Sequence, residues 1–224
     1  MTYGIITLTC NDPLYNIFDD MKREYLNNRN ILNTFVYNNA NADINIRESD
    51  SVYLSNLTGT AGIYTMFDKF IATIQNNPIW KSLDYVLRVN SSKFLNIPIL
   101  EEYIRTKLTA EKCYAGACTM PMGPNDFISG TCMVFSRDVI ELLSQTTNKH
   151  ENNRREDDLI MFDYMKRLNV PRTNIPMHWY DTNIIPSEEE ITNIMKTYPL
   201  IRIKNMKDRH SIDTAIWKLL INKG

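Results

Sequence analysis

The stretch Asp84-Tyr-Val-Leu-Arg-Val-Asn-Ser-Ser-Lys-Phe-Leu-Asn96 predicts both how the chain folds and where it binds a ligand. Its apolar run Tyr85–Val89 is typical of a buried strand, and the small oxygen-bearing side chains of Asn90-Ser91-Ser92 follow directly. In α/β proteins, ligands bind at the carboxyl ends of strands, where the sheet changes direction. With Arg88 inside the strand, the segment is a candidate floor for an anionic ligand. The alternative is an Asx/Ser turn that only ends a strand.

Outward from this stretch, strand-like and helix-like segments alternate through the first hundred residues, and hairpin-like pairs follow. The expected strands are 4–9, 34–37, 52–54, 85–89, 113–119, 131–135, 175–179 and 200–203. The expected helices begin near residue 13 and cover 62–74, 97–108, 136–143, 157–168, 186–196 and 211–221. This order predicts an α/β, Rossmann-like fold with a mixed, mainly parallel central sheet flanked by helices. Without a linker or repeat, residues 1–224 are expected to form a single domain.

Charge and cysteine usage exclude several classes of protein. The 25 basic and 26 acidic residues leave a formal charge of −1, so no global field attracts nucleic acid, and an anion site must be local. Four cysteines without a CxxC pair argue against structural zinc and indicate reduced thiols in a cytoplasmic protein. We expect no signal peptide and no membrane anchor, because no apolar run approaches the ~20 residues that span a bilayer.

Polar residues also mark three other places. The first strand ends in Thr9-Cys10-Asn11, which could present backbone groups to a nucleobase or simply form a strand-to-helix turn; GxGxxG and P-loop motifs are missing. Ser129-Gly130 precedes a strand, where a glycine allows a ligand to approach or marks an ordinary bulge. Asp157-Asp158 opens a helix, where carboxylates suit the helix dipole as well as catalysis.

In this order the sites resemble those of the GT-A class of nucleotide-sugar glycosyltransferases, particularly the β-1,3-galactosyltransferase/fringe-like families. Those families have apolar-apolar-Lys/Arg-x-Asp-Asp-Asp-x-Phe-x-Asn where this chain has residues 86–96. A glycine-bearing strand that ends in Ser136-Arg137-Asp138 and the pair Asp157-Asp158 before Leu159 are similar too. The resemblance extends from Tyr3 to about Asn205. It looks nearest to small glycosyltransferase domains of large DNA viruses such as chlorella viruses.

The resemblance implies an enzyme that moves a hexosyl or deoxyhexosyl group from a nucleoside-diphosphate sugar, UDP-linked, to a hydroxyl of a glycan or glycoprotein acceptor. Asp158 would be the base, with Asp157 as second choice, and the anomeric centre would invert. For a viral protein the compartment would be the host cytoplasm. The alternative is an inactive GT-A-fold module that binds glycan or nucleotide. A sugar nucleotidyltransferase is disfavoured, because a glycine-rich first loop is missing after Leu8.

One departure from the family concerns the metal. Its Asp-x-Asp carboxylates, which hold Mn²⁺ or Mg²⁺ against the sugar diphosphate, are replaced here by Asn90, Ser91 and Ser92, and hard cations prefer carboxylate oxygens. Either a divalent cation is held by the diphosphate, Asn90 and another ligand such as His178, or cations of the protein replace it. The alternative for His178 is simple packing beside Trp179.

Basic residues are concentrated in Arg202-Ile-Lys-Asn-Met-Lys-Asp-Arg-His210, where Arg202 and Lys204 project to the same side of a strand. Such groups suit a leaving diphosphate, but they equally suit a solvated edge balanced by Glu188–Glu190. We expect the loop at Asn90 to face the acidic pair across one cleft. The residues expected to bind the nucleotide sugar are Thr9, Cys10, Asn11, Lys69, Arg88, Asn90, Ser91, Ser92, Gly130, Lys204 and Arg209.

Overall fold

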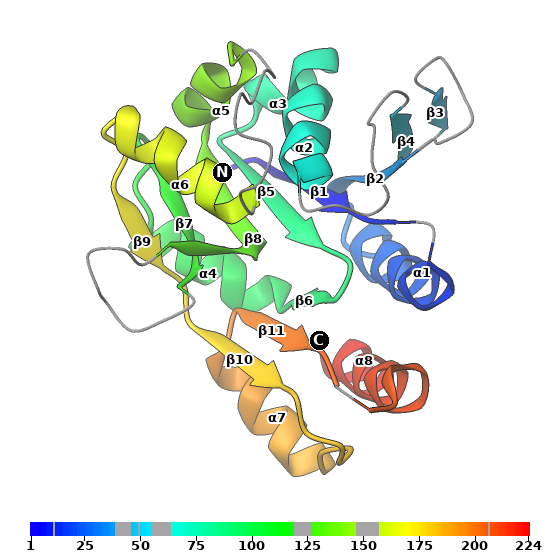
Figure 1. Ribbon diagram of the computed structural model, residues 1–224. Helices are drawn as coiled ribbons and strands as arrows, with labels where there is room; N and C mark the ends of the chain where they lie inside the picture. Colours follow the sequence, from blue (N-terminus) through cyan, green and yellow to red (C-terminus); the bar gives the residue numbers. More distant parts are fainter. Residues whose placement is uncertain are drawn as a thin grey trace.

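The strands lie in two sheets, a large one and a small one (Figure 1). The computed structural model describes residues 1–10, 12–38, 46–48, 50–54, 64–118, 127–146, 157–205 and 207–224. The large sheet has the strand order β3-β4-β2-β1-β5-β8-β7-β9 and the small sheet β10-β11-β6. The strands are β1 (Tyr3–Leu8), β2 (Leu32–Asn38), β3 (Ile46–Glu48), β4 (Ser51–Leu54), β5 (Tyr85–Asn90), β6 (Lys93–Leu95), β7 (Tyr114–Cys118), β8 (Ile128–Ser136), β9 (Arg172–Asn174), β10 (Met177–Tyr180) and β11 (Leu200–Ile203).

Strand direction in the large sheet changes at β8. Strand β1 is parallel to β2 and β5, and β2 is parallel to β4, so these strands all end at one edge of the sheet. Strand β8 runs antiparallel to β5 and β7, while β9 is parallel to β7. The prediction of a mixed, mainly parallel sheet is confirmed. Its topology places the ends of β1 and β5 beside each other, next to the start of β8.

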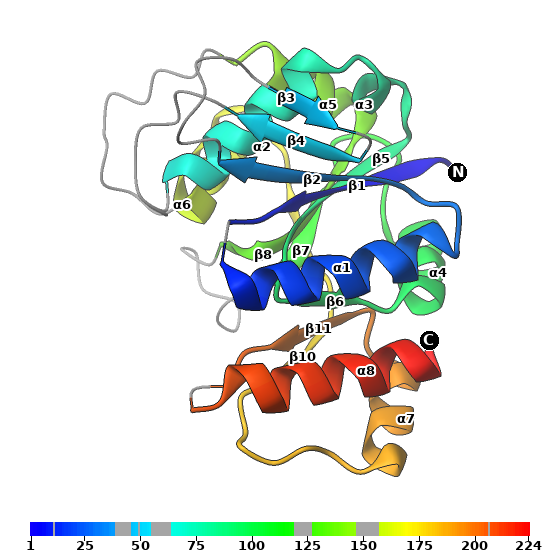
Figure 2. The same ribbon diagram turned by 90° about the vertical axis from the view of Figure 1, so that its right-hand side faces the viewer.

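Helices cover both faces of the large sheet (Figure 2). Helices α2, α3 and α5 lie on one face, and α6 packs against α2 and β8. Helix α1 lies between the other face and the small sheet, and α8 packs against α1 and α7. The bounds are α1 (Pro13–Asn27), α2 (Tyr64–Asn76), α3 (Ile79–Ser82), α4 (Ile97–Lys107), α5 (Arg137–Ser144), α6 (Asp157–Arg167), α7 (Glu188–Thr197) and α8 (Thr214–Lys223), with a π-helical turn (Arg209–Asp213) before α8.

Burial on both faces explains the apolar runs in the sequence. Ile5 belongs to the core that includes α1 and α8, whereas its neighbour Ile6 belongs to the core formed with α2 and α5. Successive side chains of a strand point to opposite faces, so a strand covered on both sides must be apolar throughout. None of the described helices is both long and apolar enough to cross a bilayer.

Local sequence signals account for several helix starts. Asp12 caps α1 by accepting a hydrogen bond from the backbone N of Leu14 at 2.9 Å, and Pro13 follows at the first position. Ser187 and Glu190 form a reciprocal capping box at the start of α7.

Strand β8 departs from the prediction: it begins at Ile128 instead of Thr131, so Gly130 lies inside the strand and not before it. The three-residue strands β3, β6 and β9 were not predicted, because such short segments carry too little periodicity.

Candidate functional site

A pocket of about 180 Å³ lies at the carboxyl ends of β1 and β5. It brings together two of the predicted polar segments, Thr9-Cys10 and Asn90-Ser91-Ser92, with Thr131 of β8. Its remaining lining residues are Leu8, Tyr15, Met66, Arg202 and Lys204. Two segments that are some eighty residues apart in sequence therefore share one site, at the edge where α/β proteins bind ligands.

The small sheet supplies the basic wall of this pocket. Trp179, Arg202 and Lys93 are cross-strand neighbours on β10, β11 and β6, so their side chains project from the same face. Lys204 follows Arg202 by two residues and lines the same pocket, which agrees with the expectation that the two side chains project to the same side. The guanidinium carbon of Arg202 lies 4.4 Å from the centre of the Trp179 ring. A cation is thereby held at the pocket between an aromatic ring and a buried lysine.

The acidic pair lies next to this pocket. Asp157 forms an ion pair with Arg88 of β5, and Asp158 Oδ2 accepts a hydrogen bond from the backbone N of Gly130 at 3.3 Å. Burial lowers the pKa of Arg202, while Tyr15 and, more weakly, the negative charge of Asp158 act in the opposite sense, so Asp158 and Arg202 lie close enough to interact. The start of α6 thus lies beside β5 and the start of β8, close to the pocket, although neither Asp157 nor Asp158 lines it. That the acidic pair and the loop at Asn90 share one cleft stays a prediction.

Gly130 makes this approach sterically feasible. A Cβ atom at this position would lie 3.0 Å from Arg88 Nη1 and 3.1 Å from Asp157 Oδ1. Contacts that short would push the ion pair away from β8. The missing side chain of Gly130 therefore leaves room for the Arg88–Asp157 pair, and the predicted approach of a ligand to this glycine stays a prediction. Arg88, only 1% exposed, positions Asp157 and does not line the pocket.

Two buried lysines hold the strand ends that form the pocket floor. Lys22 Nζ donates to the carbonyl oxygen of Asn90 at 3.0 Å, and Lys69 Nζ donates to the carbonyl oxygen of Thr9 at 2.5 Å. Both side chains are almost inaccessible to solvent, and burial lowers the pKa of each to about 8. Lys69 thus supports the pocket from below and does not contact its interior.

Lys22 shares its environment with Asp19, one turn earlier on α1. Thr9 Oγ1 donates to Asp19 Oδ2, and burial raises the pKa of the Asp19 carboxyl. The sequence reasoning missed both residues. A signal was present, because Lys22 lies four residues after Phe18 and three before Tyr25, on the apolar face of the helix. A charged residue at a core position of an amphipathic helix is expensive to bury and indicates a specific role.

Lys93 is the most enclosed of these cations, with no exposed side-chain surface. Its ammonium contacts Met177 Sδ at 2.5 Å, and burial lowers its pKa to about 7. The positive charges of Arg202 and Lys22 lower it further, while Cys132 acts in the opposite sense. Within the described part of the chain, Lys93 has no carboxylate partner. The sequence reasoning missed this residue as well.

The described residues do not fit a Mn²⁺ or Mg²⁺ site. No cluster of three or more His, Cys, Asp or Glu side chains occurs among them. His178 pairs with Ile201, so it projects from the opposite face of the small sheet to Arg202. Its ring packs against Tyr180 and Tyr198, with centroids 4.6 and 5.3 Å away, and burial lowers its pKa. The structure therefore does not bring His178 to Asn90, whose own side-chain oxygen is buried without a hydrogen-bond partner.

The remaining predicted residues have supporting positions or lie outside the described chain. Arg209 forms a 2.9 Å ion pair with Asp213 and donates to the hydroxyl of Tyr15 at 3.1 Å. Because Tyr15 lines the pocket, Arg209 positions a pocket residue and is not itself part of the lining. Asn11 lies outside the described residues.

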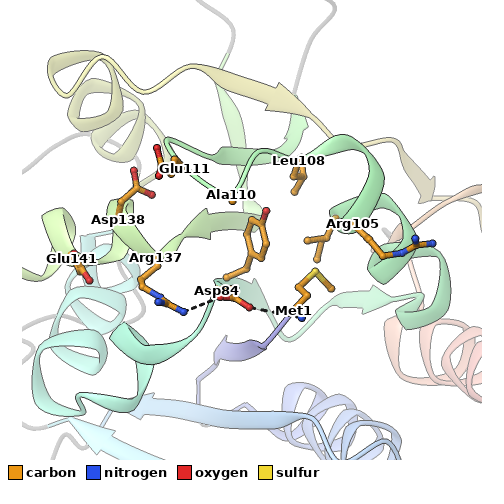
Figure 3. Close-up of a pocket in the computed structure, with 11 residues that line it drawn as sticks. Met1, Asp84, Arg105, Leu108, Ala110, Glu111, Arg137, Asp138 and Glu141 are labelled. Atoms are coloured by element: carbon orange, nitrogen blue, oxygen red, sulfur yellow. Dashed lines mark hydrogen bonds and ion pairs between the residues drawn. The ribbon is translucent and has the colours of Figure 1, made fainter.

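A second, larger cavity of about 550 Å³ lies at the opposite end of the large sheet (Figure 3). It is lined by residues that precede β5, follow β8 and end α4, including Asp84, Arg105 and Arg137. None of the residues predicted to act in binding or catalysis lines it. Arg137 instead donates to Asp84 Oδ1 at 2.8 Å and to two backbone carbonyls.

Comparison with known proteins identifies the fold. No family model and no curated protein matches the chain. Among solved structures, a glycosyltransferase involved in glycosylation of the major capsid of PBCV-1 is 13% identical, with a TM-score of 0.56 over 95% of this chain and 98% of that one. Galactosyltransferase LgtC, solved with donor and acceptor sugar analogs, is 7% identical, with a TM-score of 0.50 over 97% and 95%. The chain has the GT-A-like fold of these glycosyltransferases.

Proposed function

We propose that the chain is a glycosyltransferase that moves a sugar from a nucleoside-diphosphate sugar, UDP-linked, to a hydroxyl of a glycan acceptor, with inversion. One observation carries this proposal. The pocket at the ends of β1 and β5 combines two cations on its wall, Arg202 and Lys204, with a carboxylate beside it, Asp158. The transfer needs positive charge for the departing diphosphate and a base for the attacking hydroxyl.

The bond changes follow from these roles. The acceptor oxygen bonds to the anomeric carbon while the bond from that carbon to the diphosphate oxygen breaks. The bonding electron pair leaves with the diphosphate, next to Arg202 and Lys204, and the hydroxyl proton passes to the carboxylate of Asp158. A single displacement of this kind inverts the anomeric centre. Asp157 is the weaker candidate for the base, because its carboxylate is paired with Arg88.

The described residues at the pocket fall into those that would contact the donor and those that hold the contacting residues in place. Thr9 and Cys10 at the end of β1, together with Asn90, Ser91 and Ser92 at the end of β5, offer backbone and small polar groups to the nucleoside diphosphate. Arg88 and Gly130 hold the acidic pair next to that segment. Lys22 and Lys69 keep the two strand ends in place through their carbonyl oxygens.

A donor screen tests the proposal directly. The purified chain is incubated with UDP-, GDP- and dTDP-sugars, with and without glycan acceptors, and nucleoside diphosphate release is measured. We expect release from one donor class, and Asp158→Asn should lower turnover about 10²- to 10⁴-fold while UDP binding persists. Glu141→Gln is the matched control, because it removes an exposed carboxylate at the opposite cavity.

The competing function is a binding module with this fold and no turnover. It predicts that UDP raises the melting temperature while no donor is consumed under any condition. Equal loss of UDP binding and turnover in Asp158→Asn would instead assign a structural role to that carboxylate.

A further inference from the structure

We propose that this site binds the donor's diphosphate without a divalent cation, through Arg202 and Lys204 on the pocket wall and the buried ammonium groups of Lys22 and Lys93 behind it. The inference rests on the proposed function and deepens it. It concerns the group that neutralises the diphosphate, which the fold alone leaves undecided.

Several cations at this pocket are buried or form no ion pair. Lys22, Lys69 and Lys93 are each at most 2% exposed, and none of them forms an ion pair within the described residues. Arg202 and Lys204, which line the pocket, form none there either. The negative charge of the buried Asp19 raises the pKa of both Lys22 and Lys69, but burial still lowers each of them. Three buried ammonium groups therefore share one nearby carboxylate, and this excess of positive charge at one pocket indicates an anionic ligand.

These cations are directed toward the same region of the molecule. Cross-strand pairing places Lys93 and Arg202 side by side on the same face of the small sheet. Lys22 reaches the end of β5 from α1, and its ammonium donates a hydrogen bond to the carbonyl oxygen of Asn90. Each cation lowers the pKa of Lys93, which means that their fields overlap at one place.

The end of β5 offers only neutral oxygen atoms to a ligand. Asn90, Ser91 and Ser92 carry no formal charge, and His178 points away from the pocket. A Mn²⁺ or Mg²⁺ ion placed here would meet neutral oxygens and several cations, and both features disfavour it. A diphosphate would meet favourable groups instead, because Arg202 and Lys204 line the pocket and the ammonium groups of Lys22 and Lys93 contact the strands that border it.

The experiment is a titration of the full chain with UDP and, separately, with inorganic pyrophosphate, each in excess EDTA and again with added Mn²⁺ or Mg²⁺. We expect binding of UDP in EDTA with no gain from either metal. Arg202→Met should weaken UDP binding about 10- to 100-fold, the usual weight of a charge-assisted hydrogen bond, and Arg202→Lys should restore part of it. Arg105→Met, an exposed arginine of the opposite cavity, is the control and should bind UDP normally.

Several outcomes would overturn the inference. Binding that disappears in EDTA and returns with metal would show that a divalent cation is required. Unchanged UDP affinity in Arg202→Met would remove the assigned cation, and failure of UDP, GDP, dTDP and pyrophosphate to bind under all conditions would remove the anion site. Sugar transfer that depends on metal would refute this inference and leave the transferase intact. Metal-free UDP binding without any sugar transfer would instead support this inference and refute the proposed transferase function.

Discussion

At one end of the large sheet a cavity of about 550 Å³ is lined by arginines that are paired, whereas at the other end a pocket of about 180 Å³ is lined by cations that are not. At the larger cavity, Arg137 pairs with Asp84 (Figure 3). Arg105 pairs with Glu102 on its own helix. In the smaller pocket, Arg202 and Lys204 make no ion pair within the described chain.

The proposed binding site is therefore distinguished from the larger cavity by its unsatisfied charge and not by its volume. Ion pairs at the larger cavity are exposed, with 40% of Asp84 and 47% of Arg137 accessible, so they cost little to form and contribute little. The cations behind the smaller pocket are buried, and their desolvation is offset by few protein anions. Such an arrangement lowers the stability of the free protein and favours an anionic ligand.

The largest expected effect compares one ion pair from each end. Asp157→Ala should lower the free energy of unfolding by about 3–5 kcal/mol, because it leaves the guanidinium of Arg88 buried without a partner. Asp84→Ala should cost at most about 1 kcal/mol, because its pair with Arg137 is exposed. Urea denaturation followed by circular dichroism measures both. Similar losses for the two variants would contradict the contrast drawn between the two ends.

The next effect concerns the stability cost of Lys93. Lys93→Met should raise the free energy of unfolding at pH 6 by roughly 1–3 kcal/mol, since it removes a buried, unpaired charge. The same variant should bind UDP more weakly, because the positive field behind the pocket is reduced. Denaturation and UDP titration of one sample give both values. A variant that loses both stability and affinity would show that the lysine is a packing residue.

The buried charge of Lys93 should also make the free energy of unfolding depend on pH in a defined direction. Burial holds the pKa of Lys93 near 7 in the folded state, below its ordinary value, so between about pH 7 and 10 the unfolded chain binds more protons. Stability should therefore rise with pH across that window, and less steeply in Lys93→Met. The groups whose charge influences this lysine are the thiol of Cys132, whose own pKa burial raises to about 11, and the cations Arg202 and Lys22. Melting temperatures at a series of pH values measure the trend, and an unchanged slope in the variant would refute the assignment.

The smallest expected effect concerns the contact between Trp179 and Arg202 on the pocket wall. Trp179 is about half exposed and holds Arg202 through its ring. Trp179→Ala should weaken UDP binding about two- to fivefold, the loss of one partly exposed cation–π contact. Isothermal titration with Trp179→Phe as the matched variant tests this, and Phe should retain most of the affinity. Equal affinities of all three proteins would show that the ring does not orient Arg202.

Much of the fold could be predicted from the sequence, because apolar runs of strand length and helical periodicity reflect burial directly. The pocket segments at Thr9 and Asn90 were found in the same way, since polar residues that follow a buried strand must lie at its end. The local pattern of polar and apolar residues could not show that Arg88 pairs with Asp157 or that Gly130 leaves room for this pair. They depend on Asp157, which belongs to a helix that follows β8 in the chain and packs against it in the fold.

The sequence by itself determined the alternation of strands and helices, the local character of any anion site and the lack of carboxylates at Asn90, Ser91 and Ser92. Only the tertiary structure decided which cations surround that segment. Lys22 comes from a helix, Lys93 from a three-residue strand and Arg202 from the strand beside it. The side on which each residue lies, including His178, follows from strand register, because one residue along a strand reverses the face to which a side chain points.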